Sequence, residues 1–266
     1  MAFVALITGA SAGIGEATAR RLAREPDARL VLVARRRERL ETLATELGGA
    51  TVVAVDVTDA DAPGQVLEAV IREHGELHML VNNAGASWRG RFEETGWENV
   101  ERHMRLNFDA PVRLTEALLP LLRRTAAIAD SDRPVSIVNV ASTAGRVARP
   151  NAGGYSAAKF ALIGWSDSLY AEEREHGVHV GLVLPGFIKT EGFPAAELLA
   201  RATTRWLVST PDKVAEAIVE AGPGGRAERY VPRYYWIAAA TRVGAPRLIR
   251  RAIAGGALTT STRPGD

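Results

Sequence analysis

The sequence predicts an α/β fold, in which one domain is built on a parallel sheet with helices covering both of its faces. Short runs of apolar, often β-branched residues alternate with longer amphipathic stretches, and this alternation is typical of right-handed strand–helix–strand units. The strand-like runs are continuously apolar, as strands buried on both faces require. No internal repeat or linker divides the 266 residues, so we expect a single domain.

The expected elements follow in order from these patterns. Short apolar runs predict strands at 3–8, 30–34, 51–57, 77–81, 135–140 and 178–184, with a short last strand at 229–231. Helical spacing of apolar residues predicts helices at about 14–24, 37–47, 63–74, 97–124, 155–176 and 211–221. Pro63 suits a first helical turn, whereas Pro111 and Pro120 are expected to bend or end the long fourth helix.

Composition excludes several classes of function. Cysteine is absent, which excludes disulfides, thiolate nucleophiles and cysteine-ligated zinc, and we expect no bound metal. The formal net charge is only +2, because Asp and Glu interrupt the many arginines, so a nucleic-acid partner is not expected. We see neither a secretory signal nor the run of about 18 apolar residues that a membrane span requires. We therefore expect a cytoplasmic protein.

A glycine-rich turn joins the first expected strand to the first expected helix. Residues 8–15 read Thr-Gly-Ala-Ser-Ala-Gly-Ile-Gly. Glycines at such a junction let the backbone approach a pyrophosphate, and the N–H groups at the helix start hold its negative charge. The spacing is G-x-x-x-G-x-G rather than the G-x-G-x-x-G of the usual dinucleotide fingerprint. A purely structural turn is the alternative interpretation.

The end of the second expected strand distinguishes between two cofactors. NAD sites place an acidic residue there, which binds the ribose 2′-hydroxyl. Here Ala34 is followed by Arg35, and a guanidinium pairs with a 2′-phosphate that an acid would repel. The sequence therefore favours NADP(H) over NAD(H). Arg36 and Arg37 could instead begin a solvated helix.

Polar residues also end the third and fourth expected strands. Asp56 and Val57 close the third strand, where the aspartate could accept a hydrogen bond from an adenine amino group. Residues 82–85, Asn-Asn-Ala-Gly, close the fourth. Ligands of such sheets bind at the carboxyl ends of the strands, so we expect these residues beside the glycine-rich turn.

Three residues form a candidate catalytic group. Tyr155 and Lys159 are four residues apart at the start of an expected helix and share one of its faces, and Ser142 lies 13 residues before the tyrosine. Carbonyl reduction needs a proton at oxygen, and a nearby ammonium lowers the pKa of a phenol from its usual value of about 10. Ser142 can hold the substrate oxygen, and Lys159 can also bind the nicotinamide ribose.

Together these residues resemble the short-chain dehydrogenase/reductase family, in its compact, NADP-preferring form. The resemblance covers residues 3–190 and includes Asn107 and the pair Pro185-Gly186. It implies a Rossmann-like doubly wound sheet of about seven strands, and a catalytic group of Asn107, Ser142, Tyr155 and Lys159 in which Asn107 places a water beside the lysine. The cofactor residues that it implies are Gly9, Ser11, Gly13, Ile14, Gly15, Arg35, Asp56, Val57, Asn83, Ala84, Gly85, Tyr155, Lys159, Pro185, Gly186, Ile188 and Thr190.

The resemblance has further implications and two departures. Thr190 is implied as a ligand of the nicotinamide carboxamide, and the long helices that begin near Trp97 and Tyr155 are implied to join subunits into a homodimer or homotetramer. Ala12 stands where many NADP-dependent relatives carry a basic residue, so Arg35 must supply most of the phosphate selectivity. The stretch 125–133 is expected to form a longer loop than usual.

The substrate region is expected to be largely apolar. Candidate substrate residues, besides Ser142, are Trp88, Phe187, Phe193 and Trp206. We interpret the segment 187–209 as a mobile lid, with ordinary helix packing as the alternative. Arg146 and Arg149 could meet an anionic substrate group, but we expect them to be solvated.

The last part of the chain is basic and aromatic. Residues 232–253 mix tyrosine, tryptophan, isoleucine and leucine with five arginines, a pattern that can lie on an anionic membrane. The segment could equally cover the substrate pocket or pack on a partner subunit, and we favour packing on protein. The domain then spans residues 1–253, and 254–266, rich in Gly, Thr and Ser, is expected to be a flexible end.

The sequence thus predicts an enzyme that moves a hydride between NADP(H) and a carbonyl or secondary alcohol, with Tyr155 as the general acid/base. Its partner is a small molecule, mostly apolar. A protein of the same fold that senses NADP(H) without catalysis is the alternative, although a sensor would not need the full Ser–Tyr–Lys group. A sugar-nucleotide epimerase or dehydratase shares Tyr-x-x-x-Lys, but such chains carry a larger C-terminal substrate domain.

Overall fold

The computed structural model describes residues 2–129, 133–191, 200 and 205–254. The strands of the main sheet are β1 (Phe3–Thr8), β2 (Ala28–Ala34), β3 (Thr51–Ala54), β4 (Met79–Asn82), β5 (Val135–Val140), β6 (Val178–Pro185) and β9 (Glu228–Val231). The helices are α1 (Gly13–Leu22), α2 (Arg37–Glu46), α3 (Ala62–Glu73), α4 (Phe92–Met104), α5 (Ala110–Ile128), α6 (Gly153–Glu173), α8 (Pro211–Ala221), α9 (Trp236–Gly244) and α10 (Pro246–Ala254).

The main sheet has seven strands in the order β3-β2-β1-β4-β5-β6-β9, and every pairing is parallel. Strand order reverses direction between β1 and β4, where the chain crosses from one half of the sheet to the other. Sheets of this kind bind ligands outside the carboxyl ends of the strands at that point. The predicted doubly wound α/β fold is therefore confirmed, and it places the glycine-rich turn at the switch point.

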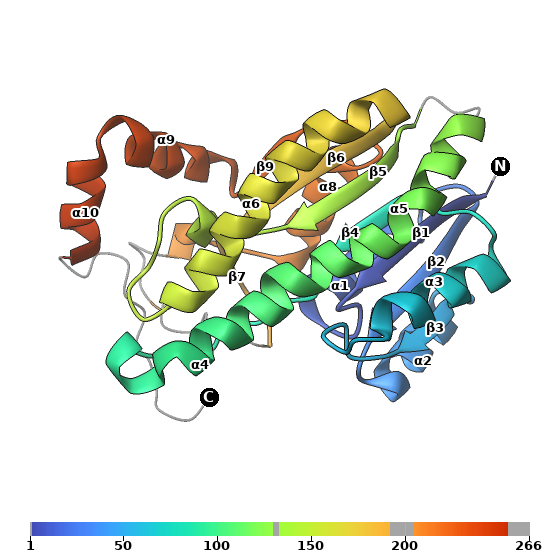
Figure 1. Cartoon of the computed structure of the whole chain (residues 1–266), viewed down its shortest axis with the longest axis horizontal. Coiled ribbons are helices and arrows are strands. Elements are labelled where there is room, and N and C mark those ends of the chain that lie inside the picture. The colour runs from blue at the N-terminus through green and yellow to red at the C-terminus, as the bar shows by residue number, and fades with distance from the viewer. Residues whose placement is uncertain (1, 130–132, 192–199, 201–204, 255–266) are drawn as a thin grey trace.

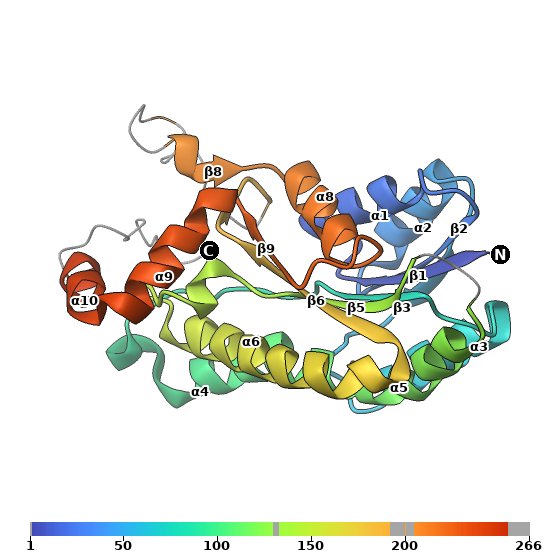
Figure 2. The same cartoon turned by 90° about the horizontal axis from the view of Figure 1, so that it is seen from above.

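Two apolar cores lie on the two faces of the sheet. One packs alternate residues of β1 and β2 against α1, α2 and α8, and the other packs the remaining strand residues against α3, α5 and α6. Figure 2 shows α1, α2 and α8 above the sheet and α3, α4, α5 and α6 below it. Because both faces are covered, all six residues of β1 and of β5 are buried, which explains their continuously apolar sequence.

The long fourth helix differs from its prediction. It begins at Phe92, contains a non-helical residue at Gly96 (φ 57°), and passes through a π-helical turn at Arg105–Asp109 before α5. Pro111 lies in the first turn of α5, where its missing N–H costs nothing, and the helix continues through Pro120. The prediction was therefore wrong for Pro120, through which the helix continues; the interruptions lie at Gly96 and at the π turn that ends two residues before Pro111.

Two other boundaries were also misplaced. Strand β3 ends at Ala54, so Asp56 and Val57 lie in the connection that follows it rather than in the strand. Helix α5 extends to Ile128, which shortens the long loop predicted for 125–133, and residues 130–132 of that loop lie outside the described residues. The strand thus ends before its apolar pattern does, whereas the helix continues past its predicted end.

The C-terminal elements lie at the carboxyl end of the sheet (Figure 1). After β6, the short strand β7 (Phe187–Ile188) pairs in parallel with β8 (Val208–Ser209). After β9, a 3-10 turn at Arg233–Tyr235 leads into α9 and α10, which stand outside the helical layers in both views. No helix among the described residues is long and apolar enough to cross a membrane.

Candidate active site

The glycine-rich turn is shaped by close contacts with the loop after β4. Gly9 and Gly13 have positive φ values of 69° and 57°, which favour glycine. A Cβ on Gly15 would lie 2.3 Å from the Gly9 carbonyl oxygen, and one on Gly9 would lie 2.9 Å from Asn83 Nδ2. These positions therefore exclude side chains, and the backbone stays open at the N-terminus of α1, where N–H groups and the helix dipole favour an anion.

Thr8 joins this turn to β4. Its hydroxyl donates to the Val81 carbonyl (3.2 Å) and accepts from the backbone N–H groups of Asn83 (2.9 Å) and Ala84 (3.0 Å). The Asn83 amide donates to the Thr8 carbonyl (2.8 Å). The Gly9 N–H bonds the Val33 carbonyl (2.8 Å). The predicted cofactor residues of the first and fourth strand ends are thus held at one edge of the sheet.

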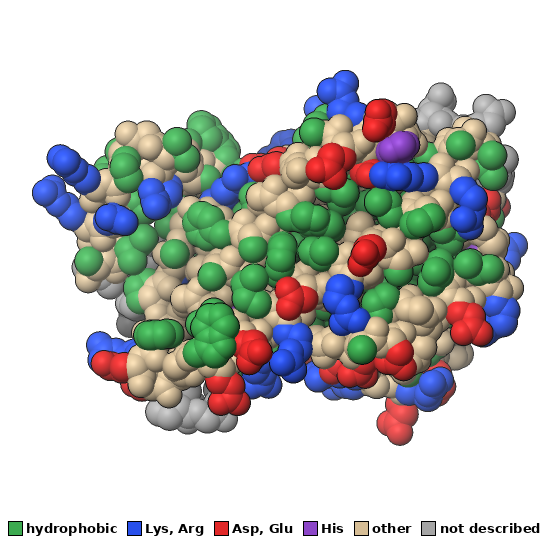
Figure 3. All heavy atoms as spheres, viewed as in Figure 1, with side chains coloured by type: hydrophobic (Ala, Val, Ile, Leu, Met, Phe, Trp, Pro, Cys, Tyr) green, Lys and Arg blue, Asp and Glu red, His purple; other side chains and the backbone are tan. Residues whose placement is uncertain are grey.

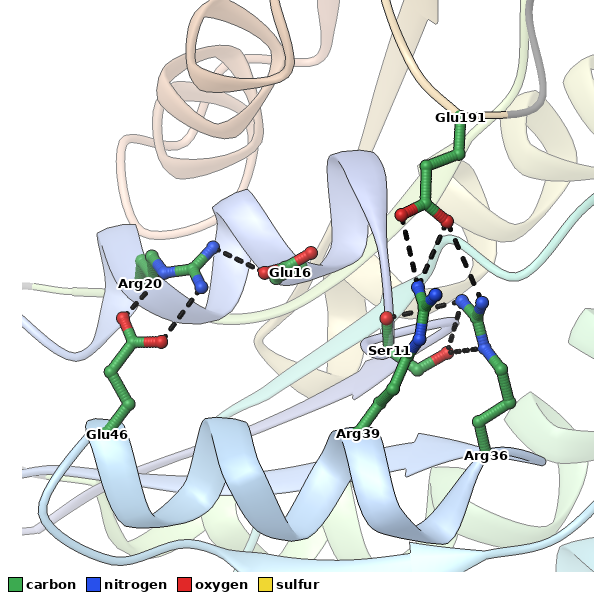
Figure 4. A network of polar contacts seen from close by, with 7 residues as sticks. All are labelled: Ser11, Glu16, Arg20, Arg36, Arg39, Glu46 and Glu191. Carbon is green, nitrogen blue, oxygen red and sulfur yellow. Dashed lines mark hydrogen bonds and ion pairs between the residues drawn. The ribbon is translucent and has the colours of Figure 1, made fainter.

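An arginine that the sequence left open lies on the glycine-rich turn. Arg36 donates from Nε to the Ser11 hydroxyl (3.1 Å) and from a terminal nitrogen to the Ser11 carbonyl (3.2 Å). Glu191 pairs with Arg39 (3.0 Å) and with Arg36 (3.7 Å), as Figure 4 shows. Two cations from the start of α2 therefore face the turn, and one acid from the substrate segment partly neutralises them.

Arg35 lies at the end of β2 and is free to meet a ligand. Its side chain is 77% exposed, and its guanidinium is 3.4 Å from Asp56 Oδ2. Burial acts to raise the pKa of Asp56, but hydrogen bonds from the Thr58 N–H and hydroxyl, together with the Arg35 charge, hold it below its usual value. Asp56 is thus an acceptor at the edge of the site, and Val57 is half-buried against the core beside it.

The catalytic group predicted from the sequence lies where β5 meets α6. Ser142 follows β5 and is 3% exposed; its hydroxyl accepts from the Ala144 N–H (3.1 Å) and donates to the Pro185 carbonyl (3.3 Å). Tyr155 and Lys159 lie in the first two turns of α6, and Lys159 Nζ is 5.9 Å from the centre of the Tyr155 ring. The structure therefore brings the three residues together.

Burial dominates the electrostatics of this group. It raises the pKa of Tyr155, while a hydrogen bond with Ser142 and the charges of Arg149 and Arg89 oppose that rise. Burial lowers the pKa of Lys159 to about 7, and the lysine, 3% exposed, donates to the Val140 carbonyl (2.8 Å). The groups that act to lower the pKa of Tyr155 are thus Ser142, Arg149 and Arg89, and Lys159 is not among them.

Asn107 lies beneath the group, in the π-helical turn between α4 and α5. Its Nδ2 donates to the carbonyls of Ala86 (3.0 Å) and His103 (3.2 Å), while its Oδ1 is buried with no hydrogen-bond partner. A Cβ on Gly85 would lie 2.8 Å from that oxygen and 3.6 Å from Lys159 Nζ. A buried acceptor without a partner calls for a donor such as a water or ligand, and it faces the same small space as the lysine.

The ring of His103 lies between those of Tyr155 and Trp88. Its ring centre is 6.1 Å from that of Tyr155 and 5.1 Å from that of Trp88. His103 Nε2 accepts from the Trp88 N–H (3.0 Å), so Nδ1 carries the proton and donates to the Asn99 carbonyl (2.7 Å). Burial lowers the pKa of His103. The histidine is therefore a neutral packing partner that orients the Tyr155 ring.

Two arginines stand on the substrate side of Tyr155. The Arg149 guanidinium carbon lies 5.0 Å from the centre of the Phe187 ring, and its Nε is buried without a hydrogen-bond partner. Burial lowers the pKa of Arg89, and so does the charge of Arg149. The expectation that Arg149 is solvated was wrong. Arg146 is half-buried and pairs with Glu228 (2.6 Å).

The remaining substrate and cofactor residues lie on the segment after β6. Pro185 ends β6, and Phe187 and Ile188 are buried at 7% and 5% exposure. A Cβ on Gly186 would meet the Tyr235 ring at 2.5 Å, and a Cβ on Gly13 would lie 3.2 Å from Thr190 Cγ2. Trp206 is 57% exposed, and Phe193 lies outside the described residues. The predicted lid spans residues 187–209. Its two described ends, 187–191 and 205–209, pair with each other through β7 and β8, and the second accepts a hydrogen bond from Tyr235 at Leu207.

The residues present fit a dinucleotide. The glycine-rich turn is a cradle that a single Cβ would fill, Ile14 packs on the core behind it, and Arg35 and Arg36 stand at one end. Thr190 adjoins the turn, and Asn107 Oδ1 is an unsatisfied acceptor at the other end. Among the described residues, no group of three His, Asp or Glu side chains could hold a metal.

The buried lysine makes the stability of the cofactor-free protein depend on pH. Its pKa of about 7 lies below the unfolded value of 10.5, so between those values the unfolded chain binds more protons and the free energy of unfolding rises with pH. We expect wild type to gain on the order of 2–3 kcal/mol relative to Lys159→Met from about pH 7 to about pH 9.5.

Urea unfolding at several pH values tests this expectation. Lys213→Met, which removes an exposed lysine of α8, is the matched control, and its difference from wild type should stay constant over the same range. A constant difference for Lys159→Met as well would show that the lysine is charged and well solvated in the folded protein.

Several site residues were missed in the sequence, and one signal could have found some of them. Arg89 was not named and directly follows Trp88, whereas Arg36 and Arg149 were named with a solvated role as the alternative or the expectation. In a chain with few lysines, arginines clustered next to predicted strand ends were the available signal. His103 and Tyr235 carry no such signal, because only the packing of α4 and of the tail brings them to the site.

Comparison with known proteins agrees with this arrangement. The family model described as short chain dehydrogenase matches residues 3–197. A dehydrogenase/reductase SDR family member 7B from Bos taurus is 34% identical over 197 residues, which cover 70% of this chain and 58% of the relative. The chain thus matches little more than half the length of that relative.

Solved structures are similar over most of the chain. The RhlG/NADP active-site complex from Pseudomonas aeruginosa has a TM-score of 0.75 at 28% identity, covering 85% of this chain and 93% of that one. A 3-ketoacyl-(acyl-carrier-protein) reductase from Brucella melitensis, complexed with NADH, has a TM-score of 0.75 at 29% identity and covers 85% and 94%. With its parallel sheet, glycine-rich turn and Ser–Tyr–Lys group, this chain belongs to the short-chain dehydrogenase/reductase family of oxidoreductases.

Proposed function

We propose that this protein is an NADP(H)-dependent oxidoreductase that transfers a hydride between the cofactor and a carbonyl or secondary alcohol carbon. One observation carries the proposal. Tyr155 lies between the Ser142 hydroxyl and the buried Lys159, at the carboxyl edge of the sheet beside the glycine-rich turn. This is the place where a doubly wound sheet binds a dinucleotide.

In this proposal Tyr155 is the general acid of the reduction. Its raised pKa keeps the phenol protonated near neutral pH, so a proton is available for the substrate oxygen. Ser142 is held by Ala144 and Pro185 and stabilises the charge that develops on that oxygen. A nicotinamide bound beside the group would supply or accept the hydride.

Lys159 and Asn107 would resupply the proton. With a pKa of about 7, the lysine can give and take a proton at little cost near neutrality. The unsatisfied Asn107 Oδ1 faces the same space, and a water there could join the lysine to bulk solvent. Because the lysine's pKa is already near neutral, small changes in its surroundings would shift its protonation.

Selectivity for NADP(H) would come from the start of α2. Arg35 is 77% exposed, and Arg36 lies on Ser11 of the glycine-rich turn. Two guanidiniums at this place suit a 2′-phosphate, which each can bind through paired N–H groups. Ala12 brings no charge of its own, so the structure supports sharing of the phosphate between Arg35 and Arg36 rather than Arg35 alone.

The substrate is proposed to be small to medium in size and mostly apolar. Phe187 and Ile188 are buried beside the catalytic group, and Trp88 packs over His103. Arg149 adds one cationic group to this apolar surrounding. A sensor without catalysis would not need Ser142, Tyr155 and Lys159 in contact with one another, and the described chain holds no second substrate domain of the kind that epimerases carry.

Assembly is proposed to involve α4, α5 and α6. Trp97 of α4 and Phe160 of α6 are 70% and 42% exposed. Between α5 and α6, a groove is lined by Val112, Leu119 and Trp165, among others. Figure 3 shows apolar side chains spread over the face of the molecule on which α4, α5 and α6 lie in Figure 1. Exposed apolar area of this kind marks protein interfaces and supports a homodimer or homotetramer.

The direct test is consumption of NADPH. Purified protein would be mixed with NADPH or NADH and a panel of ketones, aldehydes, quinones and steroids, and the loss of reduced-cofactor absorbance measured. We expect turnover of at least one carbonyl class and a higher kcat/KM with NADPH. Tight NADPH binding without turnover of any compound, in either direction, would favour the sensor.

A further inference from the structure

The C-terminal helices present apolar side chains to solvent. Trp236, Ile237 and Val243 of α9 are 56%, 53% and 83% exposed, and the spacing 236, 240, 243 places them on one face of the helix together with Ala240, which is also exposed. Leu248 of α10 is 61% exposed. We call these four large residues the tail surface. A helix normally turns such a face toward the core, and no described part of the chain covers this one.

The same helices carry positive charge and no negative charge. Residues 232–254 contain five arginines and neither Asp nor Glu. On α10, Arg247, Arg250 and Arg251 are exposed on one side, while Ile249 and Ile253 are half-buried on the other. Figure 3 shows the basic side chains at the outer end of α10, next to apolar side chains over α9. The tail is therefore an amphipathic, purely basic structure.

The inner side of the tail is attached to the substrate segment. The Tyr235 hydroxyl donates to the Leu207 carbonyl (3.0 Å), and the Tyr234 hydroxyl donates to the Trp206 carbonyl. The Tyr235 ring lies against Gly186. These contacts fix the orientation of the tail, so that its tyrosines face the domain while Trp236 begins the exposed face. The tail therefore packs on the domain through its tyrosines, as predicted, and exposes its tail surface to solvent at the same time.

A second copy of this chain is a poor partner for the tail surface. Pairing two tails would bring ten arginines together without a compensating acid within either segment, and like charges in contact repel. The surface needs a partner that is negatively charged outside and apolar beneath. An anionic bilayer has this layering, and short basic helices with exposed Trp, Ile and Leu side chains insert at its interface.

We propose that the tail surface docks the protein on the surface of an anionic lipid bilayer. The arginines bind lipid headgroups, while Trp236, Ile237, Val243 and Leu248 enter the boundary between headgroups and acyl chains. Neither α9 nor α10, with nine residues each, could span the bilayer, which needs about 20. The attachment is therefore peripheral and reversible, and it does not depend on the identity of the substrate.

Co-sedimentation of the full chain with vesicles tests the proposal. We expect binding to vesicles of phosphatidylcholine mixed with phosphatidylglycerol, little binding to phosphatidylcholine alone, and release as salt rises. The variants Arg250→Gln/Arg251→Gln and Trp236→Ser/Val243→Ser should each weaken binding about tenfold or more. These residues are exposed, so both variants should keep the wild-type melting temperature.

Matched controls remove equal charge or apolar area elsewhere. Arg37→Gln/Arg91→Gln removes two exposed arginines, and Ile71→Ser removes an isoleucine of α3 that is 48% exposed and lies outside the proposed subunit interface; both should bind vesicles as wild type does. Absence of binding to anionic vesicles, or equal binding by the tail variants and wild type, would overturn the proposal. So would a lipid-free self-association, seen by sedimentation velocity, that Trp236→Ser/Val243→Ser abolishes, since the surface would then join copies of the chain.

Discussion

Replacing Tyr155 with phenylalanine is expected to lower kcat by on the order of 10²–10⁴, the contribution of a positioned general acid. The change removes one hydroxyl and keeps the ring, which packs at 6.1 Å from His103. The glycine-rich turn, Arg35 and Arg36 are untouched, so the Kd for NADPH should stay within about threefold of wild type. Steady-state turnover of a substrate found in the panel, and fluorescence titration with NADPH, measure the two quantities.

Tyr170→Phe is the matched control for this variant. Tyr170 lies on the same helix, where its ring packs against His179 at 5.9 Å, away from the catalytic group. It should keep nearly all activity. If Tyr155→Phe retained more than about a tenth of wild-type kcat, the proton would have to come from another group, and the assignment of Tyr155 as general acid would be wrong.

Replacing Arg35 with aspartate is expected to shift cofactor preference from NADPH toward NADH by about 10²-fold or more. A hydrogen bond to a charged group contributes about 1.5–3 kcal/mol, or roughly 10–150-fold, and the new carboxylate adds repulsion of the 2′-phosphate. The aspartate is placed at position 35 rather than 34 because Ala34 is buried in the core, at 8% exposure, where a carboxylate would be destabilising. The Arg35 side chain is 77% exposed. The ratio of kcat/KM for the two cofactors measures the effect.

Two variants calibrate this result. Arg37→Asp makes the same change of charge at an exposed residue two positions along the chain, and its cofactor ratio should change only a few-fold. Arg36→Gln should lower kcat/KM for NADPH and leave that for NADH nearly unchanged, because Arg36 contacts Ser11 at the turn. An unchanged ratio in Arg35→Asp would mean that the phosphate is bound elsewhere or is not selected.

The sequence predicts the sheet well because buried parallel strands have a pattern of their own. Six-residue runs such as β1 and β5 are buried throughout, so no polar alternation confuses their assignment. The long helix was harder to predict. The apolar spacing does not mark the kink at Gly96 or the π turn at Arg105–Asp109, whereas the helix continues through Pro120, a visible helix breaker.

In the candidate site too, some features could be predicted from the sequence and others could not. Ser142, Tyr155 and Lys159 could be grouped from spacing alone, because a strand end and a first helical turn fix where they lie. The electrostatics could not be predicted. Burial raises the pKa of Tyr155, and the charges that oppose this rise are those of Arg149 and Arg89. The place of Arg149 depends on how a loop side chain folds over Phe187, and no periodicity in the sequence encodes that direction.

Glu191 links the two ends of the site. It lies three residues after β7 and pairs with Arg36 and Arg39 at the start of α2 (Figure 4). A phosphate bound at Arg36 competes with Glu191 for the same guanidinium. When two anions compete for one cation, each lowers the affinity of the cation for the other by the same factor. If NADP(H) binds as proposed, its 2′-phosphate would therefore weaken the ion pair between Glu191 and Arg36, and Glu191 in turn weakens binding of that phosphate.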